Sequence, residues 1–114
     1  MFRDNTIFNQ PIGAWNVSSV KFMDELFFLA SAFNQNIATW DVSSVETMFA
    51  MFRQATSFNQ DLSEWNCGRV TSMMSMFIGA TSFNGNVSGW NTQRVETFRS
   101  MFNRYVEIIS QFRN

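Results

Sequence analysis

Residues 58–66, Phe-Asn-Gln-Asp-Leu-Ser-Glu-Trp-Asn, set the pattern for the whole chain, because close copies of this stretch return every 25 residues. Four columns keep one residue type in every copy: Phe8, Phe33, Phe58 and Phe83; Asn9, Asn34, Asn59 and Asn84; Trp15, Trp40, Trp65 and Trp90; Val20, Val45, Val70 and Val95. A fixed period of this size is typical of stacked units, in which each repeat buries its apolar face against its neighbours.

The period predicts how the chain is organised. Its 114 residues and 46% hydrophobic content suit one folded domain with a real core. We therefore expect a single solenoid domain over residues 1–114, with repeats at about 1–25, 26–50, 51–75 and 76–100.

The first prediction within a repeat is a short helix. From Val20 onward the apolar side chains fall at Met23, Leu26, Phe27 and Ala30, which is the spacing of one face of an amphipathic helix. The next two repeats carry the same stripe. Ser43, with Glu46 three positions later, fits the capping box that starts a helix.

The other half of the repeat predicts a short parallel strand at Gln60 to Ser63, so the expected class is α/β. We expect the asparagine column to bond the backbone of adjacent coils, because its amide carries a donor and an acceptor at the same height in each coil. We expect Asx turns in a second column, formed by Asn16, Asp41, Asn66 and Asn91.

The two ends of the chain differ. An apolar stripe continues beyond the repeat unit, which predicts a C-terminal capping helix over residues 95–113; its members are Phe98, Met101, Phe102, Tyr105, Ile108, Ile109 and Phe112. At the other end Met1 and Phe2 align with Leu26 and Phe27, inside a unit and without a closing element. We therefore expect that end to be a cut or an interface.

Charge gives weak guidance about partners. The net charge is -1, so nothing draws the chain toward nucleic acid. Residues 1–65 carry three basic and seven acidic side chains, whereas residues 66–114 carry five basic and two acidic ones, so head-to-tail self-association through the N-terminal end is conceivable. No apolar run is long enough to insert in a membrane, and the N-terminus lacks the order of a signal peptide.

The composition argues against catalysis. There is no histidine, which removes the usual general base and the commonest metal ligand. Cys67 is the only cysteine and stands in the column of Val17 and Val42, so we expect a packed side chain and not a reactive thiol. The tryptophans are expected in the core, with stacking on sugars as the alternative. We expect no catalytic residue, no metal and no cofactor.

The strings Met51-Phe52-Arg53-Gln54-Ala55-Thr56-Ser57-Phe58-Asn59-Gln60-Asp61-Leu62-Ser63-Glu64-Trp65-Asn66 and Trp40-Asp41-Val42-Ser43-Ser44-Val45 resemble the BspA-like leucine-rich-repeat surface proteins, whose repeats also occur in Mycoplasma surface lipoproteins. The resemblance covers about residues 1–102. It implies a right-handed leucine-rich-repeat-like solenoid in a cell-surface or secreted protein concerned with adhesion. The sequence departs from the family pattern at Cys67-Gly68-Arg69 and at Thr92-Gln93-Arg94.

The positions that differ between repeats predict where a partner binds, because solenoids keep their core columns and vary the exposed ones. The expected binding face consists of Asn36, Thr39, Asp61, Ser63, Glu64, Asn86 and Ser88. We therefore expect a surface or adhesion-type module that binds proteins or extracellular matrix without catalysis. The alternative is a structural spacer or a self-associating part of a longer solenoid.

Overall fold

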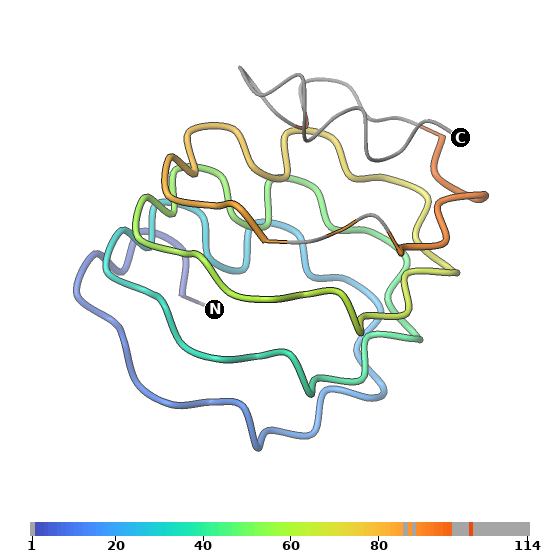
Figure 1. Cartoon of the computed structure of the whole chain (residues 1–114), viewed down its shortest axis with the longest axis horizontal. Coiled ribbons are helices and arrows are strands. Elements are labelled where there is room, and N and C mark those ends of the chain that lie inside the picture. The colour runs from blue at the N-terminus through green and yellow to red at the C-terminus, as the bar shows by residue number, and fades with distance from the viewer. Residues whose placement is uncertain (1, 86, 88, 97–100, 102–114) are drawn as a thin grey trace.

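The computed structural model describes residues 2–85, 87, 89–96 and 101. The chain winds into coils that lie against one another, and the path repeats every 25 residues (Figure 1). Each coil has a winding long side and a smoother one. We call residues 21–30, 46–55 and 71–80 the turn side, and residues 8–15, 33–40 and 58–65 the asparagine side.

The predicted α/β class, with one short helix and one short parallel strand in each leucine-rich-repeat-like unit, is wrong. Among the described residues there is no helix and no strand longer than an isolated bridge. Two parallel bridges join Phe22 to Thr47 and Thr47 to Ser72. These bridges lie on the turn side, where the helix was expected, and the strand expected at residues 60–63 does not form.

Backbone hydrogen bonds explain why no helix forms on the turn side. Alternate N–H groups leave the coil and donate to carbonyls 24 residues further along, as Met23 does to Thr47 and Phe27 does to Met51, at 3.0 and 2.9 Å. The N–H groups between them close tight turns within the coil, as Ala30 does on Phe27 at 3.1 Å. An α-helix would direct every one of these donors along its own axis. The turn side instead divides them between its own turns and the next coil.

Left-handed backbone makes this alternation possible. Glu25 and Leu29 have φ of 57° and 62°, and their equivalents in the following coils have the same sign. An α-helix requires negative φ at every residue, and a side chain in the left-handed region costs about 1–2 kcal/mol. Glycine occupies this conformation only once on the turn side, at Gly79 with φ of 72°. The residue types therefore give almost no indication of which positions have left-handed backbone.

The asparagine side joins its coils through side chains. The backbone N–H groups of Asn34, Asn59 and Asn84 donate to the side-chain oxygen of the asparagine one coil earlier, at 2.8 to 2.9 Å. The indole N–H of Trp40 donates to the carbonyl of Ile12 at 3.0 Å, and later tryptophans repeat that bond. The predicted role of the asparagine column is confirmed.

The core lies between the two sides and consists of the predicted apolar columns. Phe27, Phe52 and Phe77 stack on one another at 5.5 Å between ring centroids. Each of these rings also stacks on a phenylalanine of the asparagine side, as Phe27 does on Phe33 at 4.0 Å. The expectation of a buried core is confirmed for the phenylalanine column from Phe33 onward and for the methionine column at Met23, Met48 and Met73.

The turns at polar residues confirm one prediction from the sequence, the Asx turns, and contradict another, the capping box. The side-chain oxygens of Asn16, Asp41, Asn66 and Asn91 each accept the N–H two residues later, so the expected Asx turns are confirmed. The capping box is wrong. The Ser43 hydroxyl donates to Asp41 at 2.6 Å, and the Glu46 N–H donates to the carbonyl of Lys21 at 2.7 Å, so neither residue starts a helix.

Of the expected C-terminal capping helix at residues 95–113, only Val95, Glu96 and Met101 are among the described residues. The structure therefore describes too little of this segment to test the prediction. Met101 is buried and accepts a hydrogen bond from the N–H of Phe77 at 2.9 Å, as its equivalents do in earlier coils.

Candidate binding face

The described residues offer no grouping of three or more histidine, cysteine or acidic side chains able to hold a metal ion. The one thiol, Cys67, is buried, and burial raises its pKa to about 12 because the thiolate would lose its hydration. A thiol of this kind stays protonated and unreactive at neutral pH. The prediction that Cys67 is a packed side chain is confirmed.

The residues expected to form the binding face lie on the asparagine side, where their polar atoms hold the chain's own turns. The side-chain oxygen of Asn36 accepts the N–H of Ala38 at 2.9 Å, and that of Asp61 accepts the N–H of Ser63. The Thr39 hydroxyl donates to the carbonyl of Gly13 at 3.3 Å. Two further members of the predicted face, Asn86 and Ser88, lie outside the described residues.

Asp61 and Glu64 are the charged members of this predicted face, and both are exposed. The backbone N–H and the hydroxyl of Ser63 lower the pKa of the Asp61 carboxyl by stabilising its charged form. Glu64 makes no hydrogen bond or ion pair with any described residue. Among the described members of this face, Glu64 is therefore the one whose side chain makes no bond, because Asn36, Thr39, Asp61 and Ser63 are already bonded.

The turn side presents a different surface. Side chains that alternate with the buried methionine and phenylalanine columns point outward, and many of them are large and apolar. We define the outer face by its partly exposed members: Phe28, Phe49, Arg53, Met74 and Ile78. The equivalent positions differ from coil to coil, because Phe49 and Met74 align with Asp24 in the first coil.

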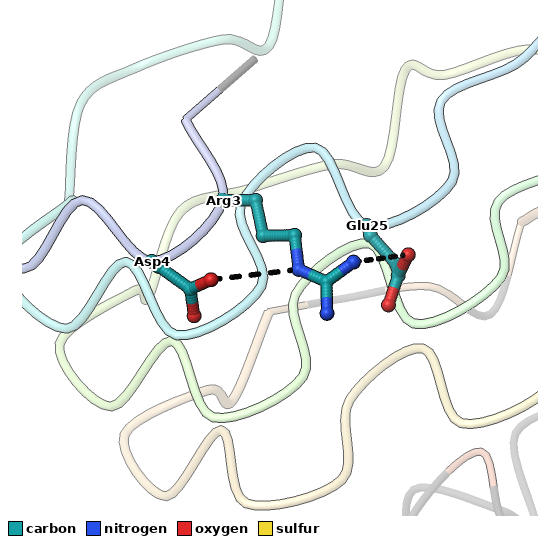
Figure 2. Close-up of polar contacts among 3 residues, drawn as sticks. All are labelled: Arg3, Asp4 and Glu25. Atoms are coloured by element: carbon teal, nitrogen blue, oxygen red, sulfur yellow. Dashed lines mark hydrogen bonds and ion pairs between the residues drawn. The ribbon is translucent and has the colours of Figure 1, made fainter.

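Arginine and phenylalanine stack at one edge of the outer face. The guanidinium carbons of Arg3 and Arg53 lie 4.9 and 5.8 Å from the ring centroid of Phe28, so two cations flank one aromatic ring. Arg3 is neutralised, since it pairs with Glu25 at 3.0 Å and with Asp4 at 3.6 Å (Figure 2).

Arg53 has no such acidic neighbour. It makes no ion pair with any residue that the structure describes, and its Nε atom is buried without a hydrogen-bond partner. A guanidinium held against an aromatic ring and lacking a carboxylate is suited to receive one, because its donors form a rigid fork that matches carboxylate geometry. Arg53 is therefore the clearest polar anchor of the outer face.

The outer face does not follow from the sequence prediction, which places its residues on the polar side of a helix. A signal is nevertheless present in the residues themselves. Phe28, Phe49, Met74 and Ile78 are large apolar side chains that stand outside the repeated apolar columns, where a helix with a solvated face would carry polar residues. Apolar side chains that do not recur with the period are not needed by the core. Their failure to recur distinguishes residues of a surface from residues of the repeated core columns.

No helix of the described residues has the length and apolar character to cross a membrane. No curated protein and no solved structure matches the chain. The family described as "Mycoplasma protein of unknown function, DUF285" matches residues 1–113. Because this match takes in nearly the whole sequence and its 25-residue pattern, the chain belongs to the DUF285 family.

Proposed function

We propose that this chain is a non-catalytic, adhesion-type module that binds a protein or an extracellular-matrix component through its outer face. The observation that carries the proposal is the gathering of Phe28, Phe49, Arg53, Met74 and Ile78, all partly exposed, on corresponding segments of successive coils. Aromatic residues, methionine and arginine are the side chains enriched at protein interfaces and at their energetic hot spots.

The construction of the stack supports this use of the turn side. Coils are joined there mainly by backbone hydrogen bonds, so an outward side chain such as Phe28, Arg53 or Ile78 can vary without loss of the bonds that hold the fold. The core behind them is fixed by stacked rings. A rigid frame with variable, partly apolar side chains lowers the entropy lost on binding, because few groups have to be ordered.

The resemblance to BspA-like surface proteins and to Mycoplasma lipoprotein repeats supports a place at the cell surface or outside the cell. The family description points to the same group of bacteria without giving a function. An adhesion-type module in that setting would meet proteins of the matrix or of another cell. The face on the asparagine side, with Asp61 and Glu64, is the competing site for the same function.

A binding measurement on both faces tests the proposal. Collagen, laminin and fibronectin are immobilised separately, and the chain is passed over each by surface plasmon resonance. Phe49→Ser with Met74→Ser should weaken binding at least about tenfold, as loss of interface anchors does. Asp61→Asn with Glu64→Gln is the matched control on the asparagine side and should leave binding within about twofold.

Three results would count against this proposal. The control pair alone weakening binding would move the site to the asparagine side. Equal effects of both pairs would show that neither face is specific. Absence of binding to all three matrix proteins would remove the matrix as the partner and leave the structural spacer as the better account.

A further inference from the structure

Arg3 and Arg53 occupy the same column of the repeat, but only Arg3 has carboxylate partners. Both guanidinium groups lie on the same ring, with their carbons 4.9 and 5.8 Å from the centroid of Phe28. Arg3 donates to Glu25 at 3.0 Å and lies 3.6 Å from Asp4 (Figure 2). Arg53 makes no ion pair with any described residue. The same fold position is therefore neutralised in one coil and left charged in another.

The residues beside the two arginines explain this difference. Next to Arg53, Gln54 takes the place that Asp4 has in the earlier coil. Ser75, which is buried, takes the place of Glu25. The backbone is alike at all four positions, because their φ angles lie between 57° and 62°. The backbone that positions the two acidic side chains is thus repeated at Arg53, but the charges are not.

The guanidinium of Arg53 keeps its capacity to donate. Its Nε atom is buried without a hydrogen-bond partner. Its two terminal nitrogens bond no described residue either, and unlike Nε they are not buried. Partial cover by an aromatic ring removes hydration from a cation, and a charge without a counter-ion in such a place favours an incoming anion.

The neighbours of Arg53 along its column indicate which kind of carboxylate fits. Phe28 lies one coil earlier and Ile78 one coil later, and both are partly exposed. A segment that covers the outer face therefore meets apolar side chains on both sides of the guanidinium. An acidic side chain inside such a segment satisfies this arrangement. A C-terminal carboxylate does not, because the partner's chain would stop on one side of it.

We propose that the protein bound by the outer face presents an aspartate or glutamate, flanked on both sides by large apolar residues, whose carboxylate pairs with Arg53. The inference rests on the proposed function, since it names the chemistry of the partner that the same face would bind. The pair of Arg3 with Glu25 shows the kind of contact expected. Arginine suits this role because its planar fork matches the geometry of a carboxylate.

Two capped peptides test the pairing on the whole chain. One is Ser-Phe-Glu-Phe-Ser, and the other has glutamine in place of glutamate, so the two differ only in one charge. Titration followed by the backbone amide NMR signals of the outer face should give a dissociation constant at least about threefold lower for the glutamate peptide. Arg53→Gln should remove that preference. Gln54→Asp should also remove it, because it supplies from within the chain the carboxylate that Asp4 supplies to Arg3.

Arg69→Gln is the matched control, since it removes an exposed positive charge that lies outside the outer face, and it should keep the preference. The dispersion of the amide signals checks that each variant is folded. Equal binding of the two peptides, no binding of either, or an unchanged preference in Gln54→Asp would overturn the proposal. A glutamine peptide with a free C-terminal carboxylate that binds as tightly as the glutamate peptide would overturn it as well.

The peptide titration and the matrix measurement fail in different ways. If Phe49→Ser with Met74→Ser abolishes matrix binding while the two peptides bind equally, the proposed function stands and the carboxylate pairing falls. If the glutamate peptide is preferred while none of the three matrix proteins binds, the pairing stands and the matrix is excluded as the partner.

Discussion

The turn side and the asparagine side hold the same coils together by different groups. On the turn side the bonds between coils run mainly from backbone N–H to backbone carbonyl, as between Phe27 and Met51, and the side chains of Asp24 and Thr71 add one bond each. On the asparagine side a side-chain oxygen or an indole N–H makes them, as in the pairs of Asn34 with Asn59 and of Trp40 with Ile12.

This difference explains which columns repeat. A bond made by a side chain requires that residue type in every coil, and the asparagine and tryptophan columns are accordingly invariant. A bond made by the backbone leaves the outward side chain free. Residues as different as Phe28, Arg53 and Ile78 therefore occupy one column of the turn side. The asparagine side needs fixed side chains to join the coils, whereas the turn side lets outward side chains differ from coil to coil.

The largest effect is expected from the tryptophan column. Trp40→Ala removes a buried ring and one of the two donors to the Ile12 carbonyl, which keeps only the N–H of Trp15, so unfolding in urea should show a loss of about 3–5 kcal/mol. Trp15→Ala is the matched control in the first coil. Its half-exposed ring should cost about 1–2 kcal/mol. Equal losses at the two positions would contradict the packing difference between the first coil and the inner coils.

A smaller effect is expected from the asparagine column. The Asn34 side-chain oxygen accepts the N–H of Asn59 and the amide of Gln60, both at 2.9 Å. Asn34→Ala removes that acceptor and should cost about 1–2 kcal/mol in the same assay. Asn34→Asp keeps an acceptor oxygen at the same place, so it should lose much less. An equal loss in both variants would show that the side-chain oxygen does not join the coils.

The sequence predicted the columns better than the conformation that connects them. The buried phenylalanines, the asparagine bonds and the Asx turns followed from residue type and period. Each depends on whether a side chain at the same position of every coil can be buried or can form hydrogen bonds. The helix prediction failed because the spacing of the apolar residues from Val20 to Ala30 fits two structures equally well. One is the apolar face of a helix, and the other is a chain that turns every few residues. Periodicity of side chains does not say where backbone donors point.

The expected binding face on the asparagine side stays a prediction. The structure adds that variable residues such as Asn36 and Asp61 also bond to their own turns, which the sequence pattern did not indicate. The outer face could be found only by knowing that its residues each directly precede a left-handed position, as Phe28 precedes Leu29. Only the structure shows those φ angles at Glu25 and Leu29, since neither residue type favours them.

The central claim is that the turn side is built from left-handed turns bonded across coils, and Gln54→Gly tests it most directly. Gln54 has φ of 58°, and Gly79 fills the same position one coil later. Glycine relieves the left-handed strain, so unfolding in urea should show a gain of about 0.5–1 kcal/mol after the entropy cost of glycine. Gly79→Ala is the reverse control and should lose stability, because its Cβ would lie 2.8 Å from Cγ of Gln54. In a helix, Gln54→Gly would instead lose about 1 kcal/mol, and that result would contradict the account.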